Sequence, residues 1–134
     1  MLAKANVRHV SGGQKEVARM ARLLLAEDGD AVRDMLRTTL ERDGFDMVPV
    51  SNVREALSRV AAEDFGALLS DLHMPHAGDG FTVVSAMRDT HLEAVTLVLS
   101  GCPQLDQALS ASGLQADEIL VKPIEISILR ERIQ

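Results

Sequence analysis

Between Leu23 and the C-terminus, short apolar runs alternate with amphipathic stretches, and this pair repeats five times. Each apolar run is too short for a helix, whereas the stretches between the runs repeat apolar residues at helical spacing. This alternation is typical of strands and helices that take turns in a parallel sheet, whose strands are buried on both faces. The sequence therefore predicts a single α/β domain, with a five-stranded parallel sheet and helices on both of its faces.

The strands are expected at residues 23–26, 45–50, 67–70, 94–99 and 118–121. Pro49 predicts an edge position for the second strand, because proline cannot donate to an interior ladder. With right-handed crossovers, five such units form a doubly wound sheet, for which we expect the flavodoxin-like strand order 2-1-3-4-5. Ligands of such sheets bind outside the carboxyl ends of the strands. The functional residues are therefore expected at those ends.

Polar residues and proline mark the starts of the expected helices. Asp30 is expected to cap the first helix, and Asn52, with Glu55 three residues later, is expected to begin the second. Pro103 suits the first position of a helix between the fourth and fifth strands. Ile126 is expected to begin the last helix.

Residues 1–21 lack this periodicity, and we expect a basic, flexible N-terminal extension with a short helix over residues 14–22. The folded domain is then expected to span residues 22–134. Five of the first 22 residues are basic and one is acidic, although the whole chain has a formal net charge of −6. The domain itself is therefore acidic, and it is not expected to bind nucleic acid, whose phosphates would repel it.

Cysteine content and apolar run length indicate the compartment. Cys102 is the only cysteine, so no disulfide can form within the chain. No apolar run approaches the roughly 20 residues that span a bilayer, and the N-terminus lacks the apolar segment of a signal peptide. We therefore expect a cytoplasmic protein without a membrane segment.

Charged and hydroxyl side chains lie at the carboxyl ends of the expected strands. Glu27 and Asp28 follow the first strand, Asp71 the third, Ser100 the fourth and Lys122 the fifth. Three carboxylates in one crevice repel one another unless a cation neutralises them, and oxygen ligands in an open cage favour Mg2+. An aspartate carboxylate can attack phosphorus, while a lysine and a hydroxyl group can bind phosphoryl oxygens. The set therefore predicts phosphoryl transfer to the aspartate, assisted by Mg2+.

Five motifs at these strand ends together resemble a receiver domain of two-component signalling. They are Glu27-Asp28, the segment SDLHMP at 70–75, the segment GDGF at 78–81, Ser100-Gly101 and Lys122-Pro123. Each motif is weak alone, but their order and their placement at five strand ends are specific, and the match covers about residues 22–134. The resemblance implies an output by protein binding, either to a downstream protein or to an output domain, and a homodimer.

The resemblance also implies a role for each site residue. Asp71 is the expected phosphoacceptor, supplied by a phosphohistidine on a sensor histidine kinase or on a phosphotransfer protein. Ser100 and Lys122 are expected to sense the phosphoryl group. The expected ligands of Mg2+, for which Mn2+ is a substitute, are Glu27, Asp28, Asp71 and the backbone carbonyl of His73. Such a domain is not an enzyme toward other molecules, because it catalyses only its own phosphorylation and dephosphorylation.

The chain departs from the usual pattern of this family. Ile119 and Ile124 stand where aromatic residues are common, so an aromatic rotamer switch is absent. The loop over residues 71–80 is one residue longer than usual. His73 and Cys102 are expected to overhang the phosphoryl group and to tune its lifetime.

Other functions remain open at this point. A degenerate receiver, acting as a phosphorylation-independent docking or dimerisation module, is favoured by the missing aromatic residues and opposed by the complete set of acids, hydroxyl and lysine. A phosphatase with an aspartyl nucleophile generally has a second acid two residues later, where this chain has His73. A zinc site at His73 and His76 lacks a third ligand at a suitable spacing. Asp71 alone would more often be a turn former, so its assignment depends on the other four groups.

Overall fold

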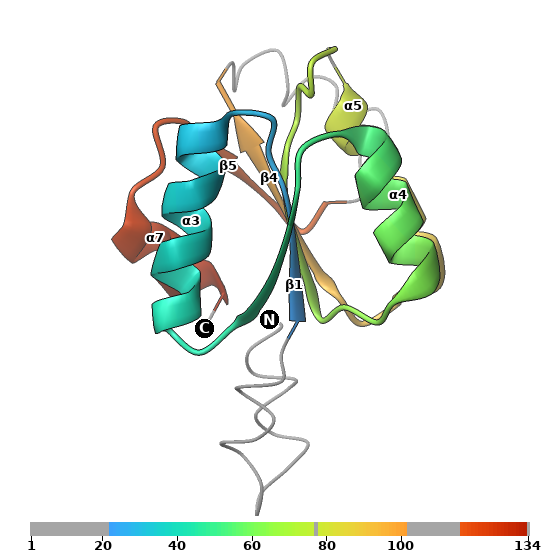
Figure 1. Ribbon diagram of the computed structural model, residues 1–134, viewed down its shortest axis with the longest axis horizontal. Coiled ribbons are helices and arrows are strands. Elements are labelled where there is room, and N and C mark those ends of the chain that lie inside the picture. The colour runs from blue at the N-terminus through green and yellow to red at the C-terminus, as the bar shows by residue number, and fades with distance from the viewer. Residues whose placement is uncertain (1–21, 77, 102–115, 134) are drawn as a thin grey trace, which may run out of the picture.

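The computed structural model describes residues 22–76, 78–101 and 116–133, which form one α/β layer structure around a parallel sheet (Figure 1). The strands are β1 (Arg22–Ala26), β2 (Asp46–Val50), β3 (Ala67–Asp71), β4 (Val95–Ser100) and β5 (Glu118–Val121). All neighbouring pairs are parallel, and the strand order is β2-β1-β3-β4-β5. The predicted order is confirmed, including the edge position of the strand that contains Pro49. The expectations for residues 1–21, and for a helix that begins at Pro103, lie outside the described residues.

Four helices in the described residues cover the two faces of the sheet. They are α3 (Asp30–Arg42), α4 (Val53–Ala62), α5 (Asp79–Thr90) and α7 (Ile126–Ile133). In Figure 1, α3 and α7 lie on one side of the sheet and α4 and α5 on the other. None of the helices in this part of the chain is long and apolar enough to cross a membrane.

The sheet divides the core into two clusters, because successive side chains of a strand point to opposite faces. In β1, Leu24 packs in the cluster beneath α4 and α5, whereas Leu23 and Leu25 pack in the cluster beneath α3 and α7. All three leucines are buried. A strand that is buried on both faces reads as a continuous apolar run, and this explains why the runs in the sequence do not alternate with polar residues.

The start of α4 agrees with the sequence prediction. The Asn52 side chain accepts a hydrogen bond from the backbone amide of Glu55 at 2.8 Å. The Glu55 carboxylate in turn accepts one from the backbone amide of Ser51 at 2.9 Å. These two bonds satisfy amides that have no partner within the helix.

The start of α3 differs from the prediction that Asp30 is its cap. Gly29 has the extended backbone of a cap residue, and Asp30 is already the first helical residue. The Asp30 carboxylate pairs with Arg33 Nη2 at 2.6 Å. Strand limits also differ by one residue at several ends. One consequence is that Asp71 and Ser100 are the last residues of β3 and β4.

Candidate functional site

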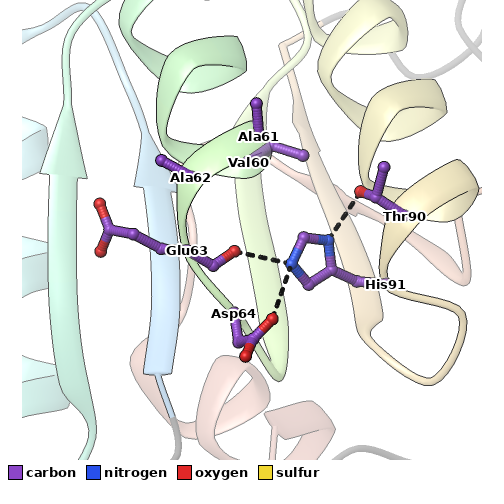
Figure 2. Close-up of a pocket in the computed structure, with 7 residues that line it drawn as sticks. All are labelled: Val60, Ala61, Ala62, Glu63, Asp64, Thr90 and His91. Atoms are coloured by element: carbon purple, nitrogen blue, oxygen red, sulfur yellow. Dashed lines mark hydrogen bonds and ion pairs between the residues drawn. The ribbon is translucent and has the colours of Figure 1, made fainter.

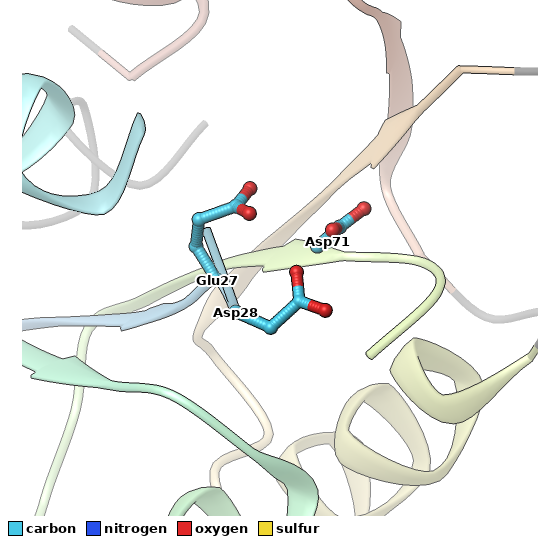
Figure 3. Close-up of side chains that lie close together, drawn as sticks. All are labelled: Glu27, Asp28 and Asp71. Atoms are coloured by element: carbon cyan, nitrogen blue, oxygen red, sulfur yellow. The ribbon is translucent and has the colours of Figure 1, made fainter. Parts of the chain in front are cut away.

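Three carboxylates meet at the carboxyl end of the sheet. Glu27 and Asp28 follow β1, and Asp71 ends β3, the neighbouring strand. One oxygen from each residue lies within 4.8 Å of the others, and Figure 3 shows the three side chains together. Glu27 and Asp71 are buried, with exposed fractions of 2% and 5%, whereas Asp28 is exposed. Burial of two like charges at such a distance is costly unless a cation compensates them.

The loop after β1 is shaped around Glu27. The backbone amide of Gly29 donates to Glu27 Oε2 at 2.9 Å. Arg33, one turn into α3, donates from Nη1 to the backbone carbonyl of Glu27, also at 2.9 Å. The role of Arg33 was not predicted from the sequence, although its spacing from Asp30 is a helical pairing signal. These bonds fix the acidic loop to the first turn of α3.

Lys122 reaches the carboxylates from the residue after β5. Its Nζ lies 3.1 Å from Asp71 Oδ2 and 3.3 Å from Glu27 Oε1. Glu27 Oε1 is buried, and within the described residues it accepts no well-formed hydrogen bond, so its contact with Lys122 is an ion pair only. One ammonium group therefore faces two buried carboxylates and leaves the cluster with excess negative charge.

Burial, followed by the nearby charge of Asp71, raises the pKa of Glu27, although the Gly29 amide and Lys122 act in the opposite direction. Burial of Lys122 works against its own charge, but the hydrogen bond and charge of Asp71, with the charge of Glu27, outweigh it and raise the pKa of the lysine. Desolvation is the largest single effect at both groups. It sets the direction of the shift at Glu27, whereas at Lys122 the combined effects of the anionic neighbours outweigh it.

The other predicted residues lie around this cluster. Ser100 ends β4 and is buried, and its backbone carbonyl accepts a hydrogen bond from the Lys122 amide at 2.8 Å. His73 lies two residues beyond Asp71, and its Nδ1 accepts a hydrogen bond from the Gly78 amide at 3.1 Å. The imidazole is thus bonded to its own loop. Cys102 lies outside the described residues.

Gly80 permits the close contact between α5 and the end of β3. A Cβ atom at this position would lie 2.5 Å from the Asp71 carbonyl oxygen and 2.8 Å from the Leu72 Cα. The Gly80 amide donates to the Leu72 carbonyl at 2.8 Å. In the sequence this glycine is only part of a motif, because no local signal reveals that another backbone segment lies against it.

The donor set fits a hard divalent cation. All the side-chain donors are carboxylate oxygens, and one of them, Glu27 Oε1, lacks a hydrogen bond within the described part of the chain. The exposure of Asp28 leaves one side of the cluster open to solvent, and Mg2+ commonly keeps water ligands. The cluster can therefore hold a cation and a phosphoryl oxygen at the same time.

A separate hollow of about 240 Å³ lies between the C-terminal ends of α4 and α5 (Figure 2). Its lining residues are Val60, Ala61, Ala62, Glu63, Asp64, Thr90 and His91. It lies near the start of β3, whereas Asp71 is at the other end of that strand. Within it, His91 Nε2 contacts the Glu63 carbonyl and His91 Nδ1 contacts Thr90 Oγ1, both at 2.8 Å. These contacts join two helix ends and do not belong to the carboxylate cluster.

A parallel sheet of this order, with a buried aspartate paired to a lysine beside two further acids, defines the class of receiver domains. The family model described as response regulator receiver domain matches residues 23–134. The chain therefore belongs to the response regulator receiver family.

Relatives and solved structures agree with this family. The response regulator protein PilR of Pseudomonas aeruginosa is 30% identical over 110 residues, which cover 82% of this chain and 24% of PilR. FleR of the same organism is 32% identical over 113 residues, which cover 84% of this chain and 24% of FleR. The chain thus spans about a quarter of the length of these two relatives.

A solved response regulator from Burkholderia pseudomallei has a similar fold, with a TM-score of 0.76 and 27% identity. The match covers 85% of this chain and 66% of that one. The Burkholderia structure contains a phosphorylated aspartic acid, a calcium ion and citrate.

Proposed function

We propose that Asp71 accepts a phosphoryl group from the phosphohistidine of a sensor histidine kinase or of a phosphotransfer protein. The observation that carries this proposal is the position of Asp71, whose carboxylate lies with two further acids and 3.1 Å from Lys122 Nζ. The phosphorylated aspartic acid of the related Burkholderia structure supports it.

In the proposed reaction an Asp71 carboxylate oxygen attacks the phosphorus atom. A new P–O bond forms as the P–N bond to the donor histidine breaks, and the imidazole leaves with the electron pair of that bond. Lys122 and the Ser100 hydroxyl donate to phosphoryl oxygens. The carboxylates of Glu27, Asp28 and Asp71 and the carbonyl of His73 would hold Mg2+, or Mn2+ in its place. Bound Mg2+ neutralises the negative charge that otherwise repels the phosphoryl group.

The output of the domain is proposed to be a change in protein binding. PilR and FleR are about four times as long as the matched segment, so output activities in such proteins can reside outside the receiver domain. The proposed partners are a downstream protein or an output domain and, for the domain itself, a second copy. We assign the reaction to the cytoplasm and assign no direct contact with nucleic acid to this acidic domain.

Intact mass spectrometry after incubation with acetyl phosphate tests the proposal. With Mg2+ present we expect one phosphoryl adduct on the unmodified chain, and none when EDTA replaces the metal. Asp71→Asn removes the nucleophilic oxygen and should give no adduct. Asp89→Asn, which changes an exposed acid on α5, is the matched control and should be phosphorylated like the parent.

An adduct that persists in Asp71→Asn would refute Asp71 as the acceptor. If no adduct forms under any condition, although the chain is folded, the domain would instead act as a docking or dimerisation module.

A further inference from the structure

We propose that the imidazole of His73 is a positioning residue, which braces the lengthened loop after β3 so that its own backbone carbonyl can bind Mg2+. This inference rests on the proposed function, because it concerns the proposed metal site. It differs from the expectation that the His73 side chain acts directly on the phosphoryl group.

A hydrogen bond joins the side chain of His73 to the backbone of Gly78. The Gly78 amide donates to His73 Nδ1 at 3.1 Å, across five residues of the loop. In this bond the backbone N–H donates and the ring nitrogen Nδ1 accepts, so the bond depends on an acceptor at the δ position of the side chain. The side chain thereby fixes the position of Gly78, which precedes α5 and has a left-handed φ of 85°.

A second set of contacts holds the backbone next to His73. The Gly80 amide donates to the Leu72 carbonyl at 2.8 Å, and the absence of a Cβ at Gly80 lets α5 contact the Asp71 backbone. The Leu72–Gly80 contact and the His73–Gly78 hydrogen bond together hold the chain at His73, whose carbonyl is the proposed ligand. The dihedral angles of His73 are therefore restrained both through the backbone and through the side chain.

Other polar groups of the loop bond to one another at its tip. The His76 amide donates to Asp79 Oδ2 at 3.0 Å, and the His76 carbonyl accepts from the Asp79 amide at 3.2 Å. These bonds organise the tip of the loop but do not bond to His73. The His76 carbonyl also accepts a hydrogen bond from the Met74 amide at 3.3 Å, so backbone groups join the tip to the segment after β3. The imidazole of His73 adds a side-chain bond to Gly78.

Two variants separate the hydrogen bond from the bulk of the ring. His73→Leu keeps a large side chain but removes the acceptor, whereas His73→Asn keeps an acceptor oxygen at the δ position. The matched control is His76→Leu, which removes an exposed imidazole from the same loop and leaves both backbone groups in place.

The measurements are hydrogen exchange of the Gly78 amide by NMR in EDTA, and the dissociation constant of Mg2+ by titration calorimetry. In His73→Leu we expect exchange of the Gly78 amide to be about tenfold faster and Mg2+ binding about tenfold weaker, as for other changes that misplace a metal ligand. His73→Asn should restore both values to within about twofold, and His76→Leu should match the parent. Thermal unfolding in EDTA should show a cooperative transition in all four proteins, which confirms that each variant is folded.

Unchanged Mg2+ binding in His73→Leu would overturn the inference, as would equally weak binding in His73→Leu and His73→Asn. If the parent chain itself binds no Mg2+, the proposed metal site fails, and the inference fails with it. Failure of the metal site can be distinguished from failure of the His73 hydrogen bond, because exchange of the Gly78 amide measures that bond in the metal-free protein.

Discussion

At the scale of single residues, the site is defined by an imbalance of charge. Glu27 and Asp71 are almost completely buried, and Lys122, whose side chain is 31% exposed, is shared between them. Solvent screens such a half-exposed lysine, so it cannot compensate two buried carboxylates fully. The metal-free protein therefore carries a destabilising contribution that a bound cation would remove.

Glu27 makes this contribution depend on pH. The pKa of Glu27 in the folded protein is raised above its ordinary value of 4.5. At pH values between the ordinary pKa and the folded-state pKa, the folded state therefore binds more protons than the unfolded state. Stability in that window falls as pH rises, and the loss stays in full above the raised pKa. We therefore expect Glu27→Gln to gain stability relative to the parent as pH increases from 4.5 to 8, in EDTA.

Urea unfolding of the parent and Glu27→Gln across this pH range is the measurement. Glu125→Gln, at an exposed residue just before α7, is the control for removal of one carboxylate. A difference between parent and Glu27→Gln that stays constant with pH would contradict the electrostatic interpretation.

At the scale of elements, the junction between β3 and α5 decides whether Asp71 lies correctly. The first turn of α5 contacts backbone atoms of Asp71 and Leu72, and backbone cannot move aside as a flexible side chain can. This contact sets the position of the β3 end relative to the loop that follows it. The position of Asp71, the proposed phosphoacceptor, therefore depends on Gly80, which has no functional group of its own.

Gly80→Ala is predicted to destabilise the domain by about 1–3 kcal/mol, as expected for overpacking a buried contact. It should also slow the phosphorylation of Asp71. Gly101→Ala is the control, because a Cβ there would meet no atom of the described residues within 4 Å. Denaturant unfolding and the acetyl phosphate assay check both effects, and equal stability of the two variants would contradict the contact.

His91 joins two other elements at the opposite end of the sheet. Its Nε2 must donate to the Glu63 carbonyl, since a carbonyl can only accept, and this bond ties the end of α5 to the end of α4. His91→Leu is predicted to cost about 1–2 kcal/mol of unfolding free energy, because a largely buried hydrogen bond is lost. Phosphorylation of Asp71 should be unaffected by this change.

Asp64→Asn serves as the control for the charge beside His91. The Asp64 side chain is fully exposed and lies 3.9 Å from His91 Nε2, so this contact should have no measurable effect on unfolding. A larger loss in Asp64→Asn than in His91→Leu would show that charge, and not the hydrogen bond to Glu63, joins the helices.

At the scale of the whole molecule, the site links separate strands of one sheet. The residues that form it follow or end β1, β3, β4 and β5, so they come together only when the sheet is complete. A cation that binds this arrangement, and binds the unfolded chain more weakly, stabilises the entire domain. Metal binding should therefore be visible in global unfolding.

We predict that Mg2+ at about 100 times its dissociation constant raises the unfolding free energy by about 2.7 kcal/mol. Asp28→Asn should leave the metal-free stability within about 0.5 kcal/mol of the parent, because this side chain is exposed. The same variant should lose most of the Mg2+ effect. Thermal or urea unfolding with and without Mg2+ checks this, and an unchanged Mg2+ effect would exclude Asp28 as a ligand.

The order of elements and the position of the site could be predicted from the sequence, because both depend on patterns that are local along the chain. Apolar runs such as Leu23 to Ala26 indicate buried strands, and the start of α4 at Asn52 follows from a pattern four residues long. Once the strands are parallel, topology brings their carboxyl ends to one edge of the sheet. The grouping of Asp71 with Glu27 follows from that rule.

The tertiary structure decided the features that depend on distances between segments, on which local patterns carry no information. Asp30 looks like a helix cap, but the loop around Glu27 makes Gly29 the cap. Gly80 has no space for a side chain because the backbone of Asp71 and Leu72 lies against it. The hydrogen bond between His91 and Glu63 joins residues 28 positions apart. Local spacing determines which elements form. Close packing between those elements determines which side chains fit, and which hydrogen bonds form, where the elements meet.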